Sequence, residues 1–336
     1  MITEEIIKSI KNKIYKPIYF LAGEESYFID EISDYIQNNI LNDEEKAFNQ
    51  IVLYGKDIDV TTIITTARRY PMLANYQVII IKEAQTVRDI ENLEIYAQSP
   101  LKSTILVINY KYKNLDKRKK LYKILSEKDY YFEFKKLYDN QLPDWIISYV
   151  NSKNLSIDIE AANLIAEFLG NDLSKIVNEI DKLIIATQNS ISKINSSVVE
   201  KYIGISKEYS PFELQKALTE KDKSKCFRIA DHYAKDEKDY YPPLILSNLF
   251  SFFSKVLLYH YIPPDKRKIQ KEVASLLNVN LYFVKDYEKA ARMFNAEKLK
   301  RIISYIRDYD MKLKGYNNIT IAYGDALKEL ISLILM

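Results

Sequence analysis

The 336-residue chain carries 49 Lys and Arg against 46 Asp and Glu, and a net charge of only +3 provides no global field that would indicate nucleic-acid binding. One cysteine and two histidines exclude an intramolecular disulfide and an ordinary zinc set, so we expect no metal site and a reducing compartment, the cytoplasm. With 47% hydrophobic residues, the chain can fill the cores of two or three globular domains.

The sequence predicts neither a signal peptide nor a membrane helix. Residues 1–16 include two glutamates and lack the apolar centre of a signal peptide. Residues 244–259 are strongly apolar but are interrupted by Asn248 and Lys255, whereas a membrane helix needs about 20 apolar residues. We therefore expect a soluble protein that has no membrane partner.

Residues 1–139 alternate between short β-rich apolar runs and amphipathic helical patterns. Five strands are predicted, at residues 17–22, 48–54, 77–81, 104–109 and 130–134. Ser26 is predicted to cap the helix after the first strand, and Asp59 is predicted to cap the helix before the third strand. Strands that alternate with helices predict an α/β domain whose parallel sheet is covered on both faces.

After the fifth strand the β pattern ends, and the rest of the chain is predicted to be helical. Residues 140–208 are expected to form a small helical lid domain that includes helices at 159–169 and 173–186. Residues 206–211 interrupt the pattern and contain a proline. A third, all-helical domain is then predicted for residues 209–336.

The loop after the first strand lies where nucleotide-binding α/β domains carry their phosphate-binding loop. Such a loop needs several glycines, a lysine for the phosphates and a Ser or Thr for magnesium. Here the loop consists of Gly23, Glu24, Glu25 and Ser26, with one glycine and no lysine. Because the two carboxylates would repel a triphosphate by roughly 1 kcal/mol or more, we expect ATP binding to be disfavoured.

The end of the third strand indicates the same loss. An ATPase carries acidic residues there to hold magnesium, whereas this strand ends in Lys82 and Glu83. A different enzyme could use Glu24 and Glu25 as an acid and base pair, but adjacent side chains point apart and no nucleophile accompanies them. We favour a solvated role for both glutamates at the helix N-terminus, where acids are stabilising.

Several segments resemble the delta subunit of the bacterial DNA polymerase III clamp loader. In the first domain these segments are residues 16–27, 68–84 and 112–122, with the sequences KPIYFLAGEESY, RRYPMLANYQVIIIKEA and YKNLDKRKKLY. The resemblance continues through residues 171–183 and, more weakly, residues 310–315, and it covers essentially the whole chain. The order and spacing of the segments carry the resemblance.

The resemblance implies an AAA+-like domain pair with a degenerate phosphate loop and no ATPase activity, followed by a helical collar through which five clamp-loader subunits assemble. It implies a role in DNA replication in which this chain binds the β sliding clamp and opens its ring for loading onto primed DNA. The gamma or tau and delta-prime subunits are the implied partners, and ATP binding in gamma or tau decides when the clamp-binding surface is exposed. No cofactor is implied, and the polymerase activity resides in another subunit.

In this family, two adjacent hydrophobic side chains bind the clamp, and their positions match Met72 and Leu73. Pro71 is predicted to end a basic helix that carries Arg68 and Arg69, leaving a loop that presents two apolar side chains to a partner. The family usually has a larger aromatic residue at the second position, so Leu73 predicts weaker binding. The alternative is that both side chains pack beneath the sheet, as an arbitrary Met-Leu pair would.

A basic cluster surrounds the start of the helix after the fourth strand. It comprises Lys111, Lys113, Lys117, Arg118, Lys119 and Lys120. Contact with the phosphates of DNA and simple solvation both stay open as interpretations. Tyr316, beside Gly315, is a candidate for stacking on a base. Trp145, Cys226 and the two histidines are predicted to be structural residues and not ligands.

Two other functions stay open on the sequence alone. An active AAA+ ATPase with an atypical loop would bind Mg-ATP with micromolar affinity. A stand-alone DNA-binding module would use the basic cluster, and its affinity would fall steeply with salt.

Overall fold

The computed structural model describes residues 2–187, 192–203, 209–235, 241–316 and 322–336. The chain divides into two compact units, Met1–Leu137 and Tyr138–Met336. The division into three domains, with boundaries after residues 139 and 208, stays a prediction. Its second boundary adjoins residues 204–208, which lie outside the described residues.

The first unit is built on a five-stranded parallel sheet with the order β2-β3-β4-β1-β5. The strands are β1 (Ile18–Gly23), β2 (Gln50–Tyr54), β3 (Gln77–Lys82), β4 (Thr104–Lys111) and β5 (Tyr131–Phe134). In this register Phe20 pairs with Ile108 of β4 and with Tyr131 of β5. Strands β1, β3 and β4 are buried along almost their whole length, as expected of parallel strands covered on both faces. The five predicted strands are confirmed.

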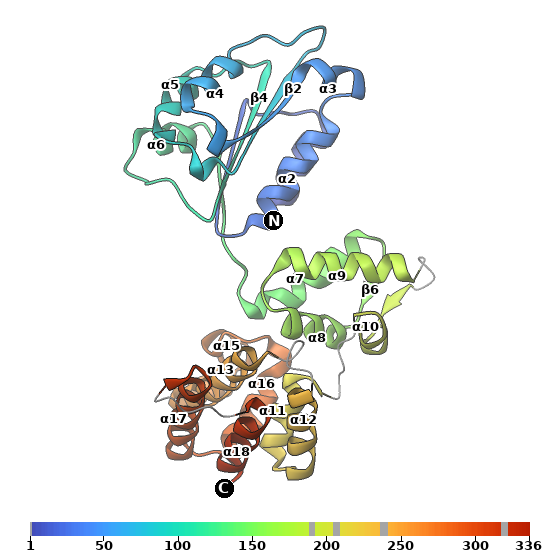
Figure 1. The fold of residues 1–336 in the computed structure, drawn as a ribbon, viewed down its shortest axis with the longest axis vertical. Helices are drawn as coiled ribbons and strands as arrows, with labels where there is room; N and C mark the ends of the chain where they lie inside the picture. The colour runs from blue at the N-terminus through green and yellow to red at the C-terminus, as the bar shows by residue number, and fades with distance from the viewer. Residues whose placement is uncertain (1, 188–191, 204–208, 236–240, 317–321) are drawn as a thin grey trace. The chain divides into compact units, whose positions relative to one another are not determined.

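Helices cover the two faces of this sheet (Figure 1). The helices of this unit are α1 (Ile2–Lys11), α2 (Ser26–Asn39), α3 (Asp43–Asn49), α4 (Val60–Ala67), α5 (Glu94–Gln98) and α6 (Lys120–Glu127), with short 3-10 turns at Gly55–Asp57, Ala84–Thr86 and Ile90–Leu93. On one face α4, α5 and α6 join the sheet in one buried cluster, in which Ile63, Tyr96 and Leu121 accompany Phe20 and Ile79 of the strands. Helix α2 covers the opposite face (Figure 1).

One of the two predicted helix caps is confirmed and the other is wrong. The carboxylate of Asp59 caps α4, accepting a first-turn backbone N–H at 2.7 Å. For α2, Ser26 is the first helical residue and Glu25 is the cap, because the Glu25 carboxylate accepts the N–H of Tyr27 at 3.2 Å. Glu25 is only 5% exposed, so the predicted solvated role is wrong for it, whereas Glu24 is exposed.

Helix α3 occupies residues that sequence analysis assigned to the second strand, so β2 begins at Gln50 and not at residue 48. A capping box starts the helix. The Asn42 side chain accepts the N–H of Glu45 at 2.9 Å, and the Glu45 carboxylate accepts the N–H of Asn42 at 3.0 Å. This reciprocal pair satisfies two of the backbone N–H groups that a helix start otherwise leaves free, which stabilises a short polar helix.

In the described residues, the second unit is helical apart from a small parallel sheet of β6 (Ser156–Ile157) and β7 (Lys193–Ile194), which the sequence analysis missed. The helices are α7 (Leu142–Ser152), α8 (Ile159–Leu169), α9 (Leu173–Ala186), α10 (Ser196–Ile203), α11 (Pro211–Glu220), α12 (Lys223–Lys235), α13 (Pro242–Tyr261), α14 (Pro264–Arg267), α15 (Gln270–Leu277), α16 (Val284–Met293), α17 (Ala296–Leu313) and α18 (Tyr323–Leu335), with 3-10 turns at Asp139–Gln141 and Leu281–Phe283. The predicted helices at 159–169 and 173–186 are confirmed as α8 and α9.

Helix α13 is the central helix of this unit's main core. It buries Ile245, Leu249 and Phe253 in a cluster to which α11, α12, α16, α17 and α18 also contribute. By length and composition α13 is the one helix in the described part of the chain that would fit a membrane span, a test that core helices also pass.

Candidate functional site

The helix that leads into the candidate loop ends earlier than predicted. We expected Pro71 to end a helix carrying Arg68 and Arg69, but α4 ends at Ala67 and Arg68 is its C-cap. The carbonyl of Arg69 accepts a hydrogen bond from the Gln77 side chain, which holds the chain away from a helical path. Both arginines are exposed just past the helix C-terminus, where cations interact favourably with the helix dipole.

The loop between α4 and β3, residues 68–76, presents apolar side chains to solvent. Met72 is 61% exposed, Leu73 is 103% exposed and their neighbour Tyr70 is 77% exposed, so neither Met72 nor Leu73 packs beneath the sheet. Leu73 has a φ of 55°, in the left-handed region, which costs a non-glycine residue roughly 1–2 kcal/mol. An exposed apolar pair on a strained backbone is a feature of binding loops.

Sequence analysis missed Asn49, the residue at the end of α3 that contacts this loop. The side chain of Asn49 is buried, accepts the N–H of Met72 at 2.6 Å and donates to the carbonyl of Met72 at 2.8 Å. Phe48, next to it, is 68% exposed. A contact between residues 23 positions apart leaves no local pattern, and only the capping pair Asn42 and Glu45 could have revealed the helix that places Asn49 there.

In the loop after β1, backbone N–H groups are paired with acceptors of the protein itself. The N–H of Gly23 donates to the carbonyl of Lys113 at 3.1 Å, and the N–H of Glu25 donates to the carbonyl of Phe134 at 3.2 Å. The N–H of Tyr27 donates to the Glu25 carboxylate. In a phosphate-binding loop, N–H groups at these positions point at the ligand. Here the N–H groups of Gly23 and Glu25 join the loop to the segment after β4 and to the end of β5.

Lys111 forms ion pairs with two acidic residues at the carboxyl end of the sheet. Its Nζ lies 2.8 Å from the Asp30 carboxylate and 3.3 Å from that of Glu83. Burial acts to lower the pKa of Lys111, but the hydrogen bonds and charges of these two acids outweigh it and raise the pKa above its ordinary value. Lys82 lies 3.7 Å from Asp34. The charges at this edge are therefore compensated within the fold.

Besides Lys111, three members of the basic cluster after β4 form ion pairs. The pairs are Lys117 with Glu133 at 3.9 Å, Arg118 with Asp116 at 2.7 Å and Lys120 with Glu94 at 3.1 Å. Hydrogen bonds from Arg118 hold the pKa of Asp116 well below its usual range. Lys119 is the N-cap residue of α6 and makes no side-chain cap hydrogen bond. Exposed ion pairs contribute little stability, so phosphate groups can compete for these cations.

The remaining residues singled out in the sequence lie in the second unit. Tyr316 is 59% exposed. Burial raises the pKa of the Cys226 thiol to about 12, so this cysteine is a poor nucleophile. Trp145 is buried, His232 stacks on a tyrosine ring at 3.9 Å, and His260 Nε2 lies 2.8 Å from a backbone carbonyl. Within the ranges that the structure describes, no group of three or more His, Cys, Asp or Glu side chains could hold a metal ion.

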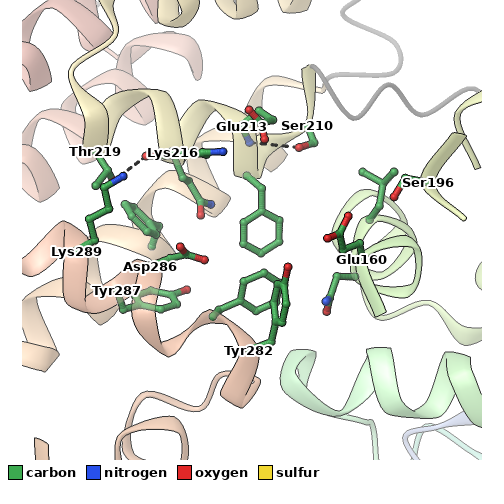
Figure 2. Close-up of a pocket in the computed structure, with 16 residues that line it drawn as sticks. Glu160, Ser196, Ser210, Glu213, Lys216, Thr219, Tyr282, Asp286, Tyr287 and Lys289 are labelled. Carbon is green, nitrogen blue, oxygen red and sulfur yellow. Dashed lines mark hydrogen bonds between the residues drawn. The ribbon is translucent and has the colours of Figure 1, made fainter. Parts of the chain in front are cut away.

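A pocket of about 310 Å³ lies in the second unit, lined by residues of α8, α11 and α16 among others (Figure 2). Its wall carries both signs of charge, with Glu160 and Asp286 on one hand and Lys216 and Lys289 on the other. Burial raises the pKa of Asp286 against the lowering effect of these two lysines. Lys289 is in turn paired with Glu220 at 2.7 Å. The pocket therefore favours no single charge in a ligand.

Residues 19–135 match the family "DNA polymerase III, delta subunit", and residues 175–319 match "DNA polymerase III delta subunit, C-terminal domain". The chain belongs to the delta-subunit family of DNA polymerase III. The two matches fall one in each unit and together cover most of the delta chain. The resemblance predicted from the sequence is confirmed.

Two curated delta proteins are similar to this chain. The DNA polymerase III subunit delta of Bacillus subtilis is 27% identical over 320 residues, which are 92% of this chain and 91% of that protein. The probable DNA polymerase III subunit delta of Mycoplasma genitalium is 28% identical over 162 residues, or 48% of this chain and 52% of that protein.

A solved structure shares the fold of this delta-family chain. The Bacillus subtilis DNA clamp loader delta protein matches with a TM-score of 0.58 and 24% identity, covering 99% of each chain. The predicted AAA+-like fold is confirmed, with a parallel sheet followed by a C-terminal region that is helical wherever the structure describes it beyond residue 209.

Proposed function

We propose that this chain is the clamp-loader subunit that binds the β sliding clamp and opens its ring for loading onto primed DNA. The observation that carries the proposal is the exposure of Met72 and Leu73 together on one anchored loop. Two adjacent apolar side chains in solvent cost free energy unless a partner covers them, and such anchors dominate protein interfaces. The name of the similar Bacillus subtilis structure, a DNA clamp loader delta protein, supports the same role.

In this proposal the chain works inside an assembly in the cytoplasm. Its partners are the gamma or tau and delta-prime subunits of the loader, joined through the helical C-terminal domain, and the primed DNA that the loader surrounds. ATP binding in the neighbouring gamma or tau subunits controls when the loop at residues 68–76 reaches the clamp. The chain itself contributes binding energy and no bond chemistry.

Direct titration tests the proposed function. We expect the isolated chain to bind its cognate sliding clamp saturably, with a Kd on the order of micromolar, or about −8 kcal/mol, of which the two buried apolar anchors contribute roughly 1.5–3 kcal/mol each. Isothermal titration calorimetry measures this affinity. If no binding to the clamp is detected with the chain at about 50 µM, a concentration well above the expected Kd, the proposed function is wrong.

We also predict that the isolated chain does not bind Mg-ATP. The N–H groups of Gly23 and Glu25 already donate to carbonyls of the protein, and Glu24 adds an exposed carboxylate at the same loop. A triphosphate would have to break these bonds and approach the carboxylate. Calorimetry with Mg-ATP is the measurement, and micromolar affinity would favour the alternative of an active AAA+ ATPase.

For the basic cluster we predict a DNA contact that depends on salt. Each phosphate contact adds about 0.9 to the slope of log affinity against log salt concentration, so replacing Lys117, Arg118 and Lys119 with alanine should lower the slope for the assembled loader on primed DNA by up to about 3. The matched control replaces three exposed lysines of the same unit, Lys8, Lys11 and Lys13. Equal slopes for the cluster variant and the wild type would show that the cluster is only solvated.

A further inference from the structure

The amide of Asn49 joins two segments that lie far apart in the sequence. Asn49 is the last residue of α3 and is 2% exposed. Its Oδ1 accepts the N–H of Met72 at 2.6 Å, while its Nδ2 donates to the carbonyl of Met72 at 2.8 Å and to that of Glu45 at 3.1 Å. Both backbone polar groups of Met72 are thus satisfied by one buried side chain.

These two hydrogen bonds pair the backbone N–H and carbonyl of Met72, as a neighbouring strand pairs those of a residue in a sheet. The hydrogen bonds fix the backbone of Met72 and leave its side chain, which is 61% exposed, free to face solvent. The next residue, Leu73, takes the left-handed conformation at φ 55° and exposes its whole side chain. A leucine adopts such a backbone only where its surroundings hold it there.

A second buried amide holds the other end of the same segment. Gln77, at the start of β3, is 4% exposed, and its Nε2 donates to the carbonyl of Arg69 and, at 2.8 Å, to the hydroxyl of Thr104. The segment 69–72 is therefore anchored to the sheet at one end and to α3 at the other. The side chains of Tyr70, Met72 and Leu73 are exposed and do not pack in the apolar core.

We propose that Asn49 is a positioning residue for clamp binding, because it holds Met72 and Leu73 in the conformation in which they enter the partner. The inference rests on the proposed function. A loop that is ordered before it binds loses less conformational entropy in the complex, so the hydrogen bonds of Asn49 raise the affinity without touching the clamp.

The substitution Asn49→Ala removes both bonds to Met72. We expect it to weaken clamp binding about 10-fold, a change of about 1.4 kcal/mol, and to increase hydrogen exchange at the Met72 amide of the free chain. The matched control is Asn39→Ala at the end of α2, where the amide donates to the carbonyl of Tyr35 in its own helix. Asn39→Ala should leave the clamp affinity within about twofold of the wild type.

A double-mutant cycle shows whether Asn49 acts through the apolar pair. In a chain that already carries Met72→Ala and Leu73→Ala, adding Asn49→Ala should weaken clamp binding no further. If Asn49→Ala prevents folding, the isosteric Asn49→Asp replaces it in the same cycle, because a carboxylate keeps the acceptor and loses the donor. It is expected to bind at least about threefold more weakly than the wild type.

The outcomes separate this inference from the proposed function. If the apolar pair matters but Asn49→Ala binds as well as the wild type, or weakens binding equally in both backgrounds, the positioning role is wrong while the proposed function stands. If the wild-type chain binds no clamp, the proposed function is wrong and the positioning role fails with it.

Discussion

Replacing Met72 and Leu73 together with alanine is expected to weaken binding to the sliding clamp by roughly 100-fold or more. Full burial of a Met or Leu side chain contributes roughly 1.5–3 kcal/mol, and alanine retains only a small part of that area. In the free chain the two side chains are 61% and 103% exposed, so their loss should change the free energy of unfolding by less than about 0.5 kcal/mol. Calorimetric titration of the clamp and a thermal melt measure the two effects separately.

The matched control for this experiment removes two other exposed apolar side chains of the same unit. Ile14 is 63% exposed and Ile95 is 57% exposed, and neither belongs to the loop at residues 68–76. The variant with alanine at both positions should bind the clamp as the wild type does. A double variant of Met72 and Leu73 that keeps more than about a third of the wild-type affinity would place the clamp-binding surface elsewhere.

Gly23→Ala is expected to destabilise the first unit by roughly 3 kcal/mol or more. Gly23 has a φ of 133°, which side-chain-bearing residues rarely adopt, and a Cβ added there would lie 2.0 Å from the carbonyl oxygen of Phe134. That atom belongs to the backbone of β5 and cannot move aside without breaking the sheet. In this chain the glycine of the loop after β1 therefore serves close packing of the loop against β5.

The control for Gly23→Ala is Gly315→Ala in the second unit. Gly315 also has a positive φ, 78°, but a Cβ there would meet no atom within 4 Å, so we expect a loss of only about 1 kcal/mol. The single tryptophan, Trp145, reports unfolding of the second unit. Gly23→Ala should lower the denaturant midpoint measured by hydrogen exchange in the first unit and leave the Trp145 transition unchanged. Similar losses for the two variants would contradict the steric account.

The parallel sheet could be predicted from sequence because its strands carry a strong local signal. Ile79, Ile80 and Ile81 lie in a short apolar run that is typical of a strand buried on both faces. Helix α3 gave no such signal, because residues 43–49 are mostly charged and the helix depends on its cap at Asn42. Two-residue strands such as β6 are too short for any periodicity to indicate them.

The candidate site was predictable only in part. The sequence placed Met72 and Leu73 in a loop next to a proline, but residue type alone favours burial for both, and their exposure follows from the backbone of Leu73 and the anchors around it. The bonds from Asn49 join residues 23 positions apart, so no local pattern encodes them. Glu25 was expected to lie in solvent. Its backbone N–H instead donates a hydrogen bond to the carbonyl of Phe134, which holds Glu25 at the end of β5.

Hydrogen exchange along the chain, measured with and without the cognate sliding clamp, tests the central claim most directly. If the apolar loop is the surface that enters the clamp, the protection gained on binding should concentrate at residues 68–76 and at the adjoining end of α3. Protection that appears elsewhere while residues 68–76 exchange as fast as in the free chain would contradict the account.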